Sequence, residues 1–184
     1  MMNRFSQITL IHGNPAHGDA APDTVQALEA ALKSAHPMVQ YARPLFPSGL
    51  TAEGALEWFE RYYLYRVPPN SLLVGVDRGG LIACAVQAAV PGLGLSVVAI
   101  NAPTEEDKLA VEPYSLQTRL ALYSSAYAPN KGRCDWKTIT SAAYDLPWLA
   151  SGCKNFYPLA YLISAFSRAA DMDKEVAMLF PSDL

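Results

Sequence analysis

The sequence predicts an α/β fold, with about six mainly parallel strands and helices on both faces of the sheet. Short apolar runs rich in β-branched residues alternate along the chain with segments whose apolar residues recur at helical spacing. The runs at 71–76 and 95–100 are almost entirely apolar, as is typical of strands that are covered on both faces. The length of 184 residues suits a single domain that spans 1–184.

Composition and charge exclude several classes of protein. Hydrophobic residues make up 51% of the chain, which is enough apolar surface for a core and excludes disorder over most of the length. The formal net charge of −3 offers no basic field to a nucleic-acid backbone. No apolar run is long enough to span a membrane, and the first apolar strand is shorter than a signal-peptide core, so a cytoplasmic location is expected. Three irregularly spaced cysteines predict neither a disulfide framework nor a metal site: Cys84, Cys134 and Cys153.

The first part of the chain contains two predicted strands and two predicted helices. Their expected ranges are a strand at 7–11, a helix at 24–35, a weak strand at 38–41 and a helix from Thr51 to the Pro68-Pro69 pair. Asp23 is the candidate cap of the first helix, and Pro37 ends it. In the second helix, aromatic side chains recur at helical spacing, and we interpret this stripe as a face that packs on the sheet.

The rest of the chain continues the alternation of strands and helices. The expected ranges are strands at 71–76, 95–100 and 119–124, an apolar helix at 81–90, a candidate strand at 136–142 and a last helix at 156–170. The polar segment at 101–113 carries an acidic run, Glu105-Glu106-Asp107, which we interpret as solvated surface. Parallel α/β sheets bind ligands at the carboxyl ends of their strands, so the segments after Ile11 and Val76 are the candidate site.

The turn after the strand at 71–76 has the form G-x-D-x-G, with Asp77 between Gly75 and Gly79. In the G-x-S-x-G turn of hydrolytic enzymes, the glycines allow a tight, strained turn that exposes the central side chain at the edge of the sheet. The N–H group after the central residue and the helix dipole stabilise an anion there. A second donor usually comes from the loop after an earlier strand, where this chain has His12-Gly13-Asn14-Pro15.

These two segments resemble motifs of the α/β-hydrolase fold family, in the branch whose nucleophile is an aspartate: haloalkane dehalogenases, fluoroacetate dehalogenases and soluble epoxide hydrolases. The first is similar to the HGNP of haloalkane dehalogenases, and Asp77-Arg78-Gly79-Gly80 is similar to the DRGG of fluoroacetate dehalogenases. The resemblance implies that Asp77 is the nucleophile and that Asn14 binds a halide or an oxyanion. It implies that Arg78 holds a substrate carboxylate or has a structural role.

The resemblance also implies that the backbone N–H groups of Asn14 and Arg78 form an oxyanion hole, with His12 and Gly13 in the same substrate-binding loop. The expected ligand is a small molecule rather than a nucleic acid or a membrane, no cofactor is expected, and a homodimer is left open as the assembly. Enzymes of this branch usually carry a helical cap domain, for which 184 residues leave no room.

The sequence departs from the family at the catalytic base. In that branch a late histidine activates the water that hydrolyses the alkyl–aspartyl ester. The corresponding stretch here, 150–155, holds no histidine, and His12, His17 and His36 all precede Asp77. No acidic residue after the later strands is persuasively placed to orient such a histidine. The predicted function is that of a small hydrolase-like protein whose hydrolytic activity is impaired or atypical.

Three hypotheses account for the missing histidine. In the first, His17 replaces it as the base that works with Asp77. In the second, the protein is a non-catalytic module that binds a small molecule or another protein, and Asp77 caps the following helix with Arg78 as its exposed partner. In the third, the site needs no histidine, with Asp77 as a general base or with Cys153 or Ser151 as a nucleophile.

Three further features have ordinary interpretations. We expect backbone hydrogen bonds in the adjoining loop to fix His12, and we expect Cys84 to be a small core residue. The glycine-rich pieces at 79–80 and 92–94 match no phosphate-binding fingerprint. A phosphate at the 78–80 turn would also meet the carboxylate of Asp77, so a nucleotide-binding domain is the weaker alternative.

Overall fold

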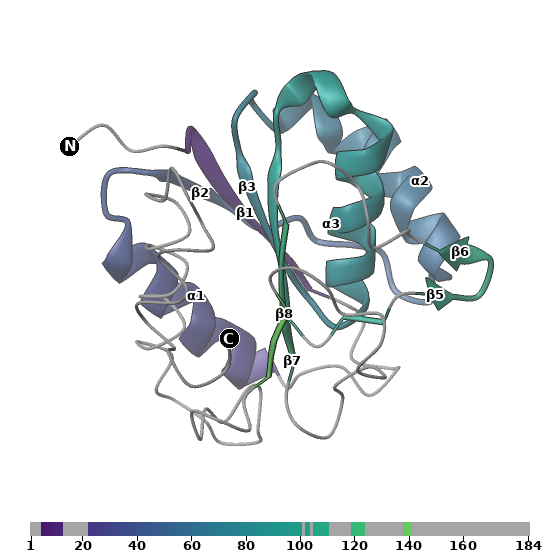
Figure 1. Cartoon of the computed structure of the whole chain (residues 1–184), viewed down its shortest axis with the longest axis horizontal. Helices are drawn as coiled ribbons and strands as arrows, with labels where there is room; N and C mark the ends of the chain where they lie inside the picture. The colour runs from purple at the N-terminus through teal and green to yellow at the C-terminus, as the bar shows by residue number, and fades with distance from the viewer. Residues whose placement is uncertain are drawn as a thin grey trace.

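The computed structural model shows a parallel β-sheet with helices on both faces (Figure 1). It describes residues 5–12, 22–100, 102–103, 105–110, 119–123 and 138–140. The main sheet has six strands in the order β2-β1-β3-β4-β7-β8. Every neighbouring pair in it runs parallel, which confirms the predicted fold class.

The described elements follow the predicted alternation. The strands of the main sheet are β1 (Gln7–His12), β2 (Gln40–Ala42), β3 (Leu72–Val76), β4 (Ser96–Ile100), β7 (Arg119–Tyr123) and β8 (Thr138–Thr140). The helices are α1 (Pro22–Ala35), α2 (Ala52–Tyr62) and α3 (Arg78–Ala89), with short 3-10 turns at Leu64–Arg66 and Pro91–Leu93. Two further strands, β5 (Glu105–Glu106) and β6 (Leu109–Ala110), form a small antiparallel hairpin.

Three details differ from the prediction. Helix α1 begins at Pro22, so Asp23, the expected cap, lies within its first turn. Helix α3 begins at Arg78 rather than Leu81, because the chain passes from strand to helix through one residue. The hairpin β5–β6 lies in the segment predicted to be irregular, since strands of two residues are too short for a periodic pattern. The predicted helix at 156–170 lies outside the described residues.

The sheet separates two apolar layers. On the face covered by α2 and α3, the strand residues Ile11, Leu73 and Val97 pack with Phe59 of α2 and Val86 of α3, all at most 1% exposed. Strand residues that alternate with these, such as Leu10 and Val74, point to the opposite face, where α1 lies (Figure 1). The aromatic stripe of α2 is thus anchored in the core by Phe59, as predicted.

Helix α2 begins with a side-chain cap. The hydroxyl oxygen of Thr51 accepts a hydrogen bond of 3.1 Å from the backbone N–H of Gly54, as expected for a threonine at this position.

In the part of the chain that the structure describes, no helix is long and apolar enough to cross a membrane.

The strand order changes direction between β1 and β3, and we call the carboxyl ends of these two strands the crevice. From β1 the chain passes outward to β2, then crosses back over β1 to β3 and continues in the other direction. The crossovers therefore diverge between β1 and β3, and ligands of open α/β sheets bind at such a point. Here His12 at the end of β1 lies opposite Val76 at the end of β3, which places Asp77 at the crevice.

Candidate active site

Asp77 joins β3 to α3 in a strained backbone conformation. Its φ of 52° and ψ of −126° lie outside the regions that a residue with a Cβ normally adopts. Two backbone hydrogen bonds hold it there: its N–H donates to the carbonyl of Ile100 over 2.9 Å, and its carbonyl accepts from Gly80 over 2.9 Å. Such strain persists only where the surroundings impose it, and it clusters at functional sites.

Three glycines allow this turn by letting backbone segments touch. A Cβ on Gly75 would lie 2.4 Å from the carbonyl oxygen of Gly79, and a Cβ on Gly80 would lie 2.4 Å from the Cβ of Ala102. A Cβ on Gly79 would lie 2.1 Å from the carbonyl oxygen of Ile11. The first turn of α3 is therefore pressed against the end of β1, at Ile11 and His12.

The side chain of Asp77 does not cap α3. Asp77 occupies the N-cap position, but its carboxylate makes no capping hydrogen bond to the helix, and the residue is partly exposed. The hypothesis that this aspartate serves as a helix cap was therefore wrong. A cap adopts extended backbone, whereas the positive φ here turns the residue away from that geometry.

Replacing Asp77 by glycine is expected to stabilise the fold. Strain of this kind destabilises the folded state by on the order of 1–3 kcal/mol, and glycine would relieve it. Glycine also raises the entropy of the unfolded chain, which offsets about 0.5–1 kcal/mol of that stabilisation. We expect a net gain of about 1 kcal/mol, measured as a rise of roughly 2–4 °C in Tm. Asp77→Ala retains a Cβ in the strained conformation and should show no such rise. Equal melting temperatures for the two variants would show that the backbone of Asp77 is not strained.

Arg78 is buried and fixed by the protein itself. Its side chain is 5% exposed, and its guanidinium forms an ion pair with Glu106 through Nε, at 2.8 Å, and Nη2. Its Nη1 donates to the carbonyl oxygen of Leu50 over 2.8 Å. The expectation that the Arg78 side chain is exposed was wrong, because these acceptors hold it inside the protein. Of its two implied roles, these contacts match the structural one.

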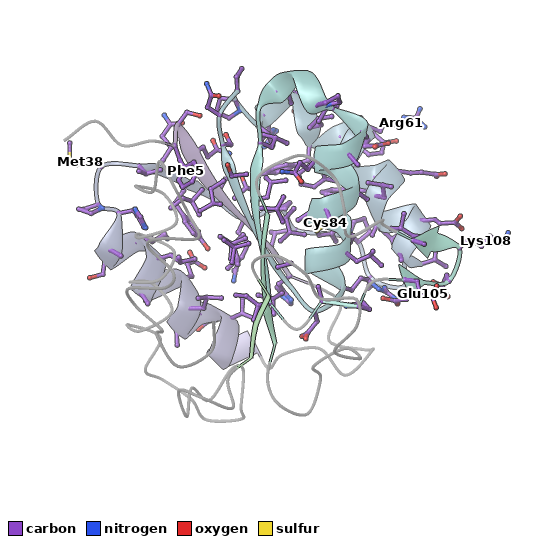
Figure 2. All side chains as sticks on the ribbon, viewed as in Figure 1. Phe5, Met38, Arg61, Cys84, Glu105 and Lys108 are labelled. Atoms are coloured by element: carbon purple, nitrogen blue, oxygen red, sulfur yellow. The ribbon has the colours of Figure 1, made fainter. Side chains whose placement is uncertain are left out.

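The hairpin β5–β6 is tied to the start of α2 as well as to the candidate site. Asp107, with a φ of 55°, accepts a hydrogen bond of 3.4 Å from the backbone N–H of Ala52. Glu106 is the partner of Arg78, whereas Glu105 and Lys108 lie at the outer edge of the hairpin (Figure 2). The acidic run is therefore only partly solvated surface, which corrects the prediction. No periodic pattern in the sequence indicates this pairing.

His12 lies beside the turn with a buried nitrogen. A Cβ on Gly79 would be 3.0 Å from the Cα of His12, so the two segments touch. Within the described residues, the buried Nδ1 of His12 has no hydrogen-bond partner. The loop expected to fix this imidazole lies outside the described residues, so that expectation stays a prediction. Burial lowers the pKa of His12, and the charge of Arg43 lowers it further. The imidazole is therefore neutral around pH 7.

The lowered pKa of His12 makes the fold less stable in acid. Below the usual histidine pKa of about 6.5, the unfolded chain takes up a proton that the folded chain refuses, so stability falls as pH falls toward the folded pKa. We expect His12→Asn to reduce the loss of Tm between pH 7.5 and pH 5.5. If Tm of the variant falls as much as that of the wild type, His12 is not the cause of the pH dependence of stability.

Several candidate residues lie outside the described part of the chain. These are Gly13, Asn14 and His17 of the loop after β1, together with Ser151 and Cys153. Their predicted roles as oxyanion donor, base or nucleophile remain predictions. His36 follows α1 and precedes β2, at the edge of the sheet opposite Asp77. Cys84 of α3 packs against the core beneath that helix, as predicted (Figure 2).

The described residues hold no metal centre. No group of three or more histidine, cysteine, aspartate or glutamate side chains within them could bind an ion. What these residues bring together is an aspartate on a strained turn, the positive end of the α3 dipole and a neutral histidine. A carboxylate so placed can act as a nucleophile or as a base.

Comparisons with known proteins establish the fold. No protein-family model matches the sequence, and no curated protein matches it significantly. Among solved structures, the chain is similar to an extracellular alpha/beta-hydrolase from a Paenibacillus species, which is said to share structural and functional homology with tobacco salicylic acid binding protein 2. The TM-score is 0.62 at 12% identity, over 89% of this chain and 99% of the other. This chain therefore has the α/β-hydrolase fold.

Proposed function

We propose that the protein is a small α/β-hydrolase-like enzyme in which Asp77 is the nucleophile and the hydrolytic half of the reaction is impaired. The observation that carries the proposal is the backbone of Asp77, held at φ 52° between β3 and α3 at the crevice of the sheet. A strained non-glycine residue at that position has a cost for stability, and a reactive side chain explains why it is kept. The α/β-hydrolase fold supports the same role.

The first chemical step uses the Asp77 carboxylate alone. One carboxylate oxygen attacks an electrophilic carbon of the substrate, a carbon–oxygen bond forms, and the leaving group departs with its electron pair. The product on the enzyme is an alkyl ester of Asp77. Because a carboxylate attacks as the anion, this step needs no base.

The second step needs a water molecule activated by a base. When water attacks the ester carbonyl, negative charge develops on its oxygen, where the N–H of Arg78 and the dipole of α3 would stabilise it. His36 lies at the wrong edge of the sheet, so the histidines left for this role are His12, at the end of β1, and His17, five positions later in the sequence. Neither occupies the position of the late histidine of the family, and ester hydrolysis is therefore expected to be slow.

The proposal is tested by intact-protein mass spectrometry after incubation with haloalkanes, haloacids and epoxides. If the reaction stops at the alkyl ester of Asp77, the wild-type protein gains the mass of one substrate group per molecule. The Asp77→Ala variant should show no such gain. Free product without an adduct would keep Asp77 as nucleophile, provided that Asp77→Ala abolishes it, but would show that a base is present. If neither an adduct nor a free product forms, the proposal is overturned.

A non-catalytic module on the same fold is the second candidate function. The observation that favours it is that every histidine of the chain precedes Asp77. Such a module would bind small molecules without modifying them. Calorimetric binding of panel compounds with no mass gain on the protein would support this alternative.

A further inference from the structure

We infer that the site takes an uncharged electrophile, in preference to the corresponding carboxylate, because the cation next to Asp77 is already neutralised by Glu106. This inference rests on the proposed function for its reaction, and on the Arg78–Glu106 pair for its selectivity. It gives Glu106 a role in specificity that the sequence pattern does not indicate.

The contacts of Arg78 carry the argument. Three of its nitrogen atoms donate to protein acceptors, two of them to the same carboxylate oxygen of Glu106 and one to the carbonyl of Leu50. The Arg78 side chain is 5% exposed and that of Glu106 is 27% exposed. A substrate carboxylate would have to compete with Glu106 for this buried guanidinium, and weakening a buried ion pair is unfavourable.

The charges around the crevice point the same way. Asp77 and Glu106 together carry two negative charges against the single positive charge of Arg78. The other arginine near the described crevice, Arg43, pairs with Glu29 at 3.4 Å. The carboxylates of Asp77 and Glu106 would repel an incoming carboxylate, whereas they would not repel an amide or another neutral group of the same shape.

The test compares two probes of one length, 6-chlorohexanamide and 6-chlorohexanoate, in reaction with the full-length protein. The Asp77 oxygen displaces chloride from either probe, and intact mass gives the rate of ester formation after subtraction of the Asp77→Ala signal. We expect the amide to react about tenfold faster or more. Equal rates, or faster reaction of the carboxylate, would overturn the inference.

A pair of variants, Glu106→Gln and Glu105→Gln, tests whether the Arg78–Glu106 ion pair causes the selectivity. Glu106→Gln leaves Arg78 without its counter-ion, so the rate ratio should move toward the carboxylate by about tenfold. Glu105→Gln changes the same charge on the exposed neighbour and should leave the ratio unchanged. A ratio that both variants shift equally would assign the effect to overall charge and contradict the role of the pair. If Glu106→Gln does not fold, the wild-type ratio decides.

Binding separates failure of this inference from failure of the proposed function. Calorimetry with the unreactive pair hexanamide and hexanoate needs no chemical step. If hexanamide binds more tightly than hexanoate while neither chlorinated probe forms an ester, the result contradicts the role of Asp77 as the nucleophile but supports the selectivity for uncharged compounds. Tighter binding of hexanoate, or no binding of either compound, would overturn the selectivity whatever the chemistry.

Discussion

Replacing Gly79 by alanine is expected to destabilise the protein by about 3 kcal/mol, which corresponds to a fall in Tm of roughly 6–12 °C. The added Cβ would lie 2.1 Å from the carbonyl oxygen of Ile11 and 2.6 Å from its carbonyl carbon. Both are backbone atoms of a central strand, so no flexible side chain can move aside. The first turn of α3 would have to shift away from β1.

The matched control for this prediction is Gly92→Ala. Nothing lies within 4 Å of a Cβ built on Gly92, and this glycine has no positive φ that a side chain would strain. The same chemical change should alter Tm by no more than about 2 °C there. If Gly79→Ala melts like Gly92→Ala, the close approach of α3 to the end of β1 is wrong.

Removing the charge of Glu106 is expected to cost about 3 kcal/mol, because Glu106→Gln leaves the Arg78 guanidinium buried without a counter-ion. The two hydrogen bonds to one carboxylate oxygen weaken, whereas the bond from Nη1 to the Leu50 carbonyl is unchanged. Chemical denaturation should show this loss as a lower midpoint at an unchanged slope.

The double variant Arg78→Met with Glu106→Leu distinguishes a buried pair from simple packing. When both charges are replaced by apolar side chains of similar volume, no uncompensated charge remains, so stability should return to within about 1 kcal/mol of the wild type. A double variant less stable than Glu106→Gln alone would mean that the pair is not the cause. Glu105→Gln, on an exposed side chain, should change stability by about 0.5 kcal/mol or less.

The sequence predicted the main sheet well because each strand carries a local signal. The apolar runs at 71–76 and 95–100 became β3 and β4, and the helical spacing around Leu28 and Phe59 became α1 and α2. The G-x-D-x-G pattern also located the strained turn, since only glycines permit the close contacts found there. These features depend on residues near one another in the chain, where patterns are readable.

The sequence could not predict contacts between distant segments. Arg78 and Glu106 are separated by 28 positions, and both are charged residues whose default interpretation is solvent exposure. The hairpin that carries Glu106 has strands of two residues, too short for any period. The buried nitrogen of His12 likewise depends on how α3 meets β1, which no local pattern encodes.

The most direct test of the account is to locate the mass that an electrophile adds. After incubation with 6-chlorohexanamide, proteolysis and fragment-ion sequencing should place one added group on Asp77, within the peptide that contains residues 75–80, and none on Cys84, Cys134 or Cys153. An added group on a cysteine, with Asp77 unmodified, would contradict the assignment of Asp77 as the nucleophile.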